Sequence, residues 1–303
     1  MRQLDLTLPE KKKYTLVLVA IFYIPAWLVS MIYINEQSND IFLIILRELV
    51  VNIPLIGIII FATRQFPKHQ IKISNPKQEG QIALLYTIAY LLLLYALFPF
   101  IKYSLILGGI FFNFGFLWGF LVIIPLLFLM KRNYGFSSFG LTKQYLGKAI
   151  FLGMVAALLK DIPNYLFPSF FQNSTALAIL RGELPPATLL LFPLALIFAL
   201  LTGPFPEEFF FRATLQTRLS LLLKSQFLAL VLAALFHGLW HLPLPGLEII
   251  VEQGFLFTIA TYIALLPTAL VFGVLWLRTG NLAAPVIYHA WVVASGGLTM
   301  IRL

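Results

Sequence analysis

The sequence predicts an all-α protein, a polytopic transmembrane helix bundle of about eight or nine spans. Its 303 residues are 60% hydrophobic and only 11% charged, with a mean hydropathy of +0.93. Soluble domains carry about 25% charged residues, so a chain this apolar needs the bilayer as its solvent. Apolar runs of about 20 residues recur, whereas strands of a membrane barrel alternate over about 10 residues. Helices are therefore expected throughout.

The apolar runs define the expected helices in chain order. They are residues 14–34, 41–63, 81–101, 105–130, 147–169, 187–203, 226–243, 254–277 and 281–302. The first run is too long for a signal-peptide core and is expected to be a retained helix. Two polar connectors, 64–80 and 131–148, separate groups of runs. We expect residues 1–146 to form N-terminal helices with cytoplasmic connectors, and residues 147–303 to form a C-terminal helix bundle.

The distribution of basic residues predicts the orientation of the chain. Lys and Arg gather in the leader that ends at Lys11-Lys12-Lys13 and in alternate connectors, so the positive-inside rule places the N-terminus in the cytoplasm. An integral, multi-pass protein is expected, in the plasma (inner) membrane if the source is bacterial. The net charge of +9 forms no long basic stripe, so no nucleic-acid partner is expected. The absence of cysteine excludes disulfides, thiolate zinc sites and cysteine nucleophiles.

Two charged couplets, Arg47-Glu48 and Lys160-Asp161, lie inside apolar runs. Adjacent residues on a helix point about 100° apart, so each couplet is expected to pair across helices. A substrate or proton path is the alternative interpretation. A transporter would use these groups, but no inverted repeat supports one.

A Glu-Glu pair follows a helix-breaking segment. Gly203 and Pro204 are expected to end one helix, and Pro206 suits the first turn of the next, which Glu207 and Glu208 open. Arg212 lies at i+4 from Glu208, which predicts an ion pair between them and leaves Glu207 free to act as a general base.

Three of the four histidines lie in apolar runs after residue 200. His237 and His241 are four residues apart, so one helix face presents both, as in two-histidine metal sites. His289 lies in the last run. Ionisable groups at membrane depth are costly and indicate a functional site, here expected in a cavity between the C-terminal helices.

Three elements in this order resemble the motifs of the CPBP family, the CAAX prenyl protease and bacteriocin-processing group of intramembrane endopeptidases, which also includes abortive-infection proteins. The elements are Glu207-Glu208-x-x-x-Arg212, Leu239-Trp240-His241-Leu242-Pro243, and Arg278-Thr279-Gly280-Asn281 leading to His289-Ala290. The resemblance covers about the last third of the chain, residues 187–300.

The resemblance implies hydrolysis of a peptide bond in a membrane-associated peptide or protein, prenylated or carrying a leader. Glu207 and His241 would activate water, and Glu208 and Arg212 would support them. His289 would stabilise the oxyanion. The resemblance allows either a glutamate-type mechanism or a divalent metal such as Zn²⁺, for which the candidate ligands are His237, His241 and His289.

Two positions depart from the family pattern. His237 stands where the family has Phe, and Val293 stands where it has Asn or Asp. In the family, the Asn at this position is expected to donate a hydrogen bond to the oxyanion. Loss of one such donor lowers the rate of catalysis by about 10²–10³. His237 either compensates, as a donor or a metal ligand, or marks a non-catalytic membrane immunity or scaffold protein, the alternative function.

The straight layout of runs places Glu207 and His241 at different depths. Residues 226 to 241 rise about 22 Å along a helix, which separates the two side chains. For them to share a water, either the chain turns back at Gly203–Pro206 or the helix that carries His241 starts at a shallow depth.

Overall fold

The computed structural model describes residues 2–3, 51–64, 72–102, 111–166, 188–241 and 266–300. Within these segments the only regular structure besides helices is a short antiparallel pair, β1 (Arg2–Gln3) with β2 (Lys72–Ile73). The predicted all-α class is therefore confirmed for the described residues. The predicted helix 14–34 and the couplet Arg47-Glu48 lie outside them.

Most of the described helices coincide with predicted apolar runs, but two parts of the layout were wrong. One helix begins at Pro76, inside the predicted connector 64–80, and residues 204–222 are helical although they lie between two predicted runs. In chain order the helices are α3 (Ile53–Ala62), α4 (Pro76–Lys102), the π-helix η2 (Phe111–Ile123), α6 (Ile124–Met130), the 3-10 helix η3 (Phe136–Phe139), α7 (Leu146–Leu166), α9 (Thr188–Thr202), α10 (Pro204–Glu208), the π-helix η4 (Phe209–Gln216), α11 (Thr217–Leu222), α12 (Gln226–His241), α15 (Leu266–Thr279) and α16 (Ala283–Met300). The predicted run 105–130 divides into η2 and α6 where it is described.

Helix length sets how many of these elements cross a bilayer unaided. Among the described residues one helix, Pro76–Leu97, is both long and apolar enough to do so. A second candidate is the pair Leu190–Thr202 and Pro204–Leu222, which passes the same test together but bends by 43°. The total of about eight or nine spans stays a prediction.

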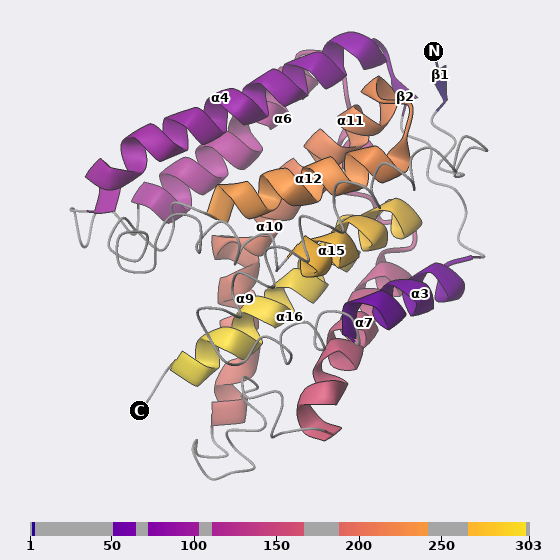
Figure 1. Ribbon diagram of the computed structural model, residues 1–303, viewed down its shortest axis with the longest axis vertical. Helices are drawn as coiled ribbons and strands as arrows, with labels where there is room; N and C mark the ends of the chain where they lie inside the picture. Colours follow the sequence, from indigo (N-terminus) through magenta and orange to yellow (C-terminus); the bar gives the residue numbers. More distant parts are fainter. Residues whose placement is uncertain are drawn as a thin grey trace, which may run out of the picture.

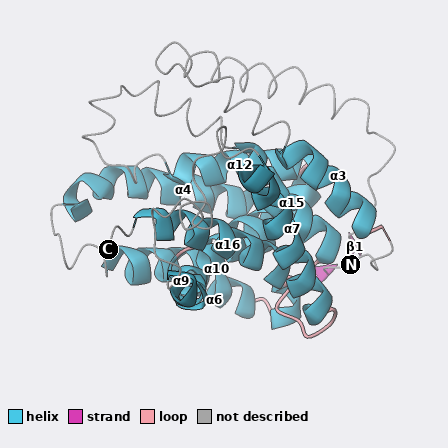
Figure 2. Ribbon diagram, turned by 90° about the horizontal axis from the view of Figure 1, so that it is seen from below, coloured by secondary structure: helices cyan, strands magenta, loops and turns pink. Residues whose placement is uncertain are grey.

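Helix α16 lies in the middle of the bundle. It packs against α7, α9, α10 and α15, and Figure 2 shows these helices around it. In Figure 1, α4 and α12 run side by side across the upper part of the molecule, and α15 lies between α12 and α16. The helices that carry the candidate site, α10, α12 and α16, therefore meet in the interior.

The core joins the two halves of the sequence. Leu55 and Ile59 of α3 share a buried cluster with Leu275 and Tyr288 of the C-terminal helices. Leu94 of α4 belongs to a second cluster that includes residues of η4 and α12. Side chains on both sides of residue 146 thus form common cores, and the division into 1–146 and 147–303 stays a prediction about the sequence.

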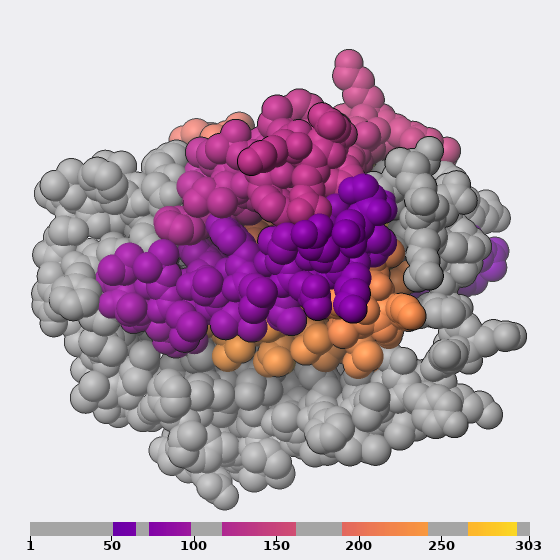
Figure 3. All heavy atoms as spheres, turned by 90° about the horizontal axis from the view of Figure 1, so that it is seen from above, coloured from indigo at the N-terminus to yellow at the C-terminus, as the bar shows by residue number. Residues whose placement is uncertain are grey.

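Large apolar side chains cover parts of the outer surface. Leu190 on α9 is 81% exposed, Phe151 on α7 is 68% exposed, and Leu92 on α4 is 67% exposed. Figure 3 shows the face on which α4 lies across the front. Exposed large apolar side chains on three helices fit contact with lipid.

The couplet Lys160-Asp161 pairs across helices, as predicted. Asp161 Oδ2 accepts a hydrogen bond from Trp291 Nε1 of α16 at 2.8 Å. Lys160 Nζ lies 6.0 Å from the centroid of the Tyr288 ring. Both contacts join α7 to α16, the helix that carries His289.

The turn before α16 fixes where that helix begins. Gly280 adopts φ +58°, which favours glycine, and ends α15. The Asn281 side chain accepts from the Ala283 amide at 3.0 Å and donates to the carbonyls of Thr142 and Gln144, both at 3.1 Å. Thr279-Gly280-Asn281, part of the third motif, is thus a structural turn that caps α16 and joins it to the segment before α7.

Gly153 permits the close packing of α7 on α16, and its replacement is a direct test of that packing. A Cβ at Gly153 would lie 2.6 Å from the backbone oxygen of Ala284. We expect Gly153→Ala to lower the free energy of unfolding by about 1–3 kcal/mol through overpacking. Chemical denaturation of the purified protein in detergent measures this.

Gly147 on the same helix provides the matched control, because a Cβ there meets nothing within 4 Å. We expect Gly147→Ala to change stability by less than about 1 kcal/mol. Equal destabilisation by both substitutions would contradict the packing described.

Candidate active site

The bend between α9 and α10 places the two glutamates. Thr202 ends α9, Gly203 has φ −146° and ψ −65°, and Pro204 occupies the first turn of α10. A Cβ at position 203 would lie 3.0 Å from Glu207 Oε1. Glycine therefore lets the Glu207 carboxylate lie against the backbone of the bend. The predicted helix start before the glutamates is confirmed, but Pro204 begins this helix and Pro206 is its third residue.

A π-helix continues α10 and carries Arg212. In η4 each turn holds an extra residue, a distortion frequent at functional sites. Two hydroxyl groups add bonds to carbonyls of this stretch: Thr214 Oγ1 donates to Phe209 O at 3.1 Å, and Thr217 Oγ1 donates to Arg212 O at 3.0 Å. All eight residues of η4 are buried, which holds the distorted turn in place.

Three imidazoles converge on one oxygen atom of Glu207. His237 Nε2 lies 2.8 Å from Glu207 Oε2, His241 Nε2 lies 3.6 Å from it, and His289 Nε2 lies 3.8 Å from it. The predicted meeting of α10, α12 and α16 is thus observed, and α9 meets α10 at a bend of 43° just before Glu207.

Glu208 and Arg212 form the predicted ion pair. Arg212 Nε donates to Glu208 Oε2 at 3.0 Å, and both side chains are fully buried. The other carboxylate oxygen, Oε1, lies 2.9 Å from His289 Nδ1. Because this carboxylate accepts hydrogen bonds, the Nδ1 of His289 carries a proton.

Arg212 also fixes the tautomer of His237. Its NH2 group lies 2.9 Å from His237 Nδ1, and a guanidinium can only donate. Nδ1 of His237 therefore accepts, and the ring proton resides on Nε2, which donates to Glu207 Oε2. A chain of hydrogen bonds leads from Arg212 through His237 to Glu207. Sequence spacing did not indicate this link, because its members come from two helices.

The site opens on the side of His241. Its side chain is 32% exposed, whereas those of Glu207, His237 and His289 are between 3% and 8% exposed. A water molecule or a substrate would therefore reach Glu207 past His241.

Aromatic rings enclose the imidazoles. Phe211 stacks on His237 with centroids 4.7 Å apart, and Phe272 stacks on His289 at 4.3 Å. Trp240 meets His241 edge-on at 4.7 Å. The apolar rings orient the imidazoles and strengthen the electrostatic interactions between the polar groups. Phe272 was not predicted, because nothing distinguishes it from other apolar residues of the run 254–277.

Two triplets have donor atoms close enough together to hold one metal ion. They are Glu207, His237 and His241, and Glu208, His237 and His289. The predicted ligand set His237, His241 and His289 is not a triplet of this kind among the described residues. Both observed triplets include His237, whose Nδ1 accepts from Arg212 and whose Nε2 carries the proton. The spacing fits a metal ion, but the hydrogen bonds of His237 do not.

Comparison with known protein families gives one match. Residues 189–295 match the family model described as type II CAAX prenyl endopeptidase Rce1-like, which covers less than half of the chain but includes all six candidate site residues. Searches of curated proteins and of solved structures gave no match. The resemblance to the CPBP group is thereby confirmed for this part of the chain, and the family is one of membrane-embedded proteases. Residues 189–295 are thus similar to the Rce1-like type II CAAX prenyl endopeptidases.

Proposed function

We propose that this protein is an intramembrane endopeptidase that hydrolyses a peptide bond of a membrane-associated substrate with a water molecule activated by Glu207 and His241. The convergence of three imidazoles on Glu207 Oε2, within an apolar bundle, carries the proposal. The family match supports peptidase chemistry in general.

Glu207 acts as the general base in this mechanism. The separation of 3.6 Å between Glu207 Oε2 and His241 Nε2 suits one water molecule held by both groups. Glu207 takes a proton from the water molecule while the oxygen atom of that water attacks the carbonyl carbon of the substrate. The same proton then passes to the amide nitrogen, the carbon–nitrogen bond breaks, and an amine and a carboxylic acid leave.

His289 stabilises the oxyanion of the tetrahedral intermediate. Its Nδ1 proton is donated to Glu208, so Nε2 donates to the oxyanion only when the ring carries both protons. A cationic His289 balances the site: two carboxylates face one guanidinium and one imidazolium.

Glu208, Arg212 and His237 position the reacting groups. Glu208 holds His289, and Arg212 holds both Glu208 and His237. The Nε2 proton of His237 directs Glu207 Oε2 toward His241. His237 thus has a defined role in place of the Phe of related proteins, and that role needs no metal.

The substrate is proposed to be a peptide or protein held at the membrane, by a prenyl group or by a hydrophobic leader. The protein itself is proposed to be an integral, multi-pass protein of the plasma (inner) membrane with a cytoplasmic N-terminus. Exposed apolar side chains on α4, α7 and α9 support the membrane location.

One observation favours a second candidate function, that of a non-catalytic immunity or scaffold protein. Val293 lies on α16 where the family has Asn or Asp, and its apolar side chain is 42% exposed. The site therefore lacks one polar group of its relatives. Cleavage assays separate the two functions.

Replacement of Glu207 by glutamine tests the proposed function. Glu207→Gln keeps the size of the side chain but removes the base, so we expect cleavage to fall by about 10²–10⁴. The assay uses protein reconstituted in vesicles with a farnesylated CAAX-type peptide and with an unmodified leader-type peptide.

Asp161→Asn is the matched control, because it neutralises a buried carboxylate outside the site and keeps an oxygen that accepts from Trp291. This variant should cleave as the wild type does. Wild-type cleavage by Glu207→Gln would contradict the mechanism. Cellular function that survives this substitution undiminished would favour the non-catalytic alternative.

Removal of divalent metal ions tests the role assigned to His237. Since both nitrogens of His237 are engaged, we expect the cleavage rate to be unchanged after treatment with 1,10-phenanthroline or EDTA. As a control, the same chelators should inhibit a known zinc protease reconstituted in the same vesicles. Loss of activity that Zn²⁺ restores would contradict the hydrogen-bonding assigned to this site.

A further inference from the structure

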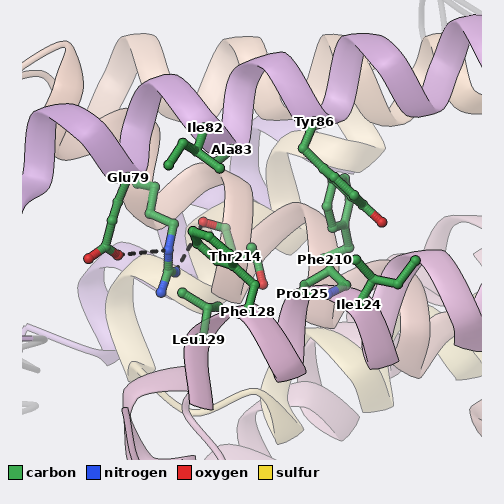
Figure 4. Close-up of a pocket in the computed structure, with 11 residues that line it drawn as sticks. Glu79, Ile82, Ala83, Tyr86, Ile124, Pro125, Phe128, Leu129, Phe210 and Thr214 are labelled. Carbon is green, nitrogen blue, oxygen red and sulfur yellow. Dashed lines mark hydrogen bonds and ion pairs between the residues drawn. The ribbon is translucent and has the colours of Figure 1, made fainter. Parts of the chain in front are cut away.

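A groove outside the candidate active site contains a buried charged group. Three elements line it: α4, α6 and the continuous stretch of η4 and α11. Its lining residues include Glu79, Ala83, Tyr86, Ile124, Phe128 and Arg218. Figure 4 shows Glu79 at one end and Tyr86 with Ile124 at the other. The cavity has a volume of ≈ 100 Å³, and none of the six candidate site residues lines it.

Arg218 brings an incompletely bonded guanidinium to this groove. Its NH1 donates to the carbonyls of Ala213 and Thr214 at 3.1 and 3.3 Å, and its Nε lies 3.5 Å from Glu79 Oε2. The NH2 group has no acceptor, although the residue is only 2% exposed. An unsatisfied buried charged donor is costly, so an acceptor supplied by a ligand would stabilise the structure.

Basic side chains surround this end of the groove. Arg132 NH1 lies 3.6 Å from Glu79 Oε1, so the segment after α6 meets the first turn of α4. Exposed lysines flank the same place: Lys77 in α4, Lys131 after α6, and Lys224 after α11. Glu79 is the one carboxylate among the described residues here, so the positive charge exceeds the negative. An anion is therefore favoured at this end.

The rest of the groove is apolar and continues onto apolar surface. Ala83 lies between the two ends, and Ile124 lies at the end opposite Glu79. Outside it, Leu85 on α4 is 66% exposed and Leu127 on α6 is 60% exposed. The ligand that fits both parts has one anionic head and a hydrocarbon tail.

We propose that the groove between α4 and α6 binds an anionic phospholipid, with its phosphate at Arg218 and Arg132 and an acyl chain along Ala83 and Ile124. Basic pockets between membrane helices bind anionic head groups in this manner. Arg218 belongs to α11, which continues the helix of Glu207 and Glu208 through η4. The bound lipid therefore contacts α11, the C-terminal part of the continuous helix that carries Glu207 and Glu208.

Lipid retention by the full-length protein tests this site. The protein is purified from nanodiscs of equal parts phosphatidylglycerol and phosphatidylcholine, and native mass spectrometry counts the lipids that remain bound. We expect wild-type protein to retain one phosphatidylglycerol in preference to phosphatidylcholine. Arg132→Gln should weaken retention by about fivefold, the effect of one basic residue near a lipid surface. Ala83→Leu should abolish it by filling the groove.

Each variant has a matched control on the same element. Lys131→Gln removes an exposed charge next to Arg132, and Ala89→Leu enlarges an exposed alanine of α4; both should retain lipid as the wild type does. Equal retention of the two lipids overturns the proposal, as does undiminished retention by Ala83→Leu.

Thermal unfolding in detergent separates the sources of phosphate. Phosphatidylglycerol should raise the melting temperature of the wild type and of Ala89→Leu, but not that of Ala83→Leu. An equal rise with inorganic phosphate would show a site for a free anion and would overturn the lipid assignment. These readouts do not depend on proteolysis, so the failure of either proposal leaves the other standing.

Discussion

The buried ion pair between Arg212 and Glu208 is the interaction on which the rest of the site depends. The guanidinium is fully buried and donates in two directions, to Glu208 and to His237. Through these two partners it sets the proton positions of His289 and His237, and therefore the surroundings of Glu207. Breaking a buried pair of this kind costs about 3–5 kcal/mol, because one charge is left without a partner. The pair thus serves stability and site geometry together.

Two distortions of the backbone bring this pair to the histidines. The 43° bend at Gly203 redirects the chain at the point where Glu207 begins to face α12 and α16. The π-helix η4 then winds the chain more widely, and buried hydroxyl groups donate to two of its carbonyls. Irregular backbone in an apolar environment is tolerated where the surrounding protein satisfies its polar groups. Here that irregularity coincides with the site.

Local spacing predicted much of the site. The i,i+4 separation of Glu208 and Arg212 predicted their ion pair, and the same separation of His237 and His241 predicted their shared face. Gly203 and Pro204 predicted the break before Glu207. The resemblance to known motifs predicted that α16 would bring His289 to the same place. These features depend on residues close in sequence or on family patterns, which a sequence records directly.

Other features depend on contacts between distant helices and were not predictable. The straight layout of apolar runs separated Glu207 from His241, because hydropathy does not show a bend or a π-helix. His237 remained open between donor and metal ligand until the position of Arg212 NH2 was known. The ion pair of Glu79 with Arg218 joins α4 to α11 over a long stretch of sequence, and no periodicity indicated it. The predicted helix 14–34 lies outside the described residues and stays a prediction.

We infer that Arg212 orients the site by fixing the proton of His237 on Nε2. Solid-state NMR of ¹⁵N-histidine-labelled protein in lipid measures this directly, since the chain has only four histidines and His237→Phe identifies the resonances of interest. We expect a neutral His237 with a protonated Nε2 and an unprotonated Nδ1. A proton on Nδ1 of neutral His237, or a metal-bound ring, would contradict it.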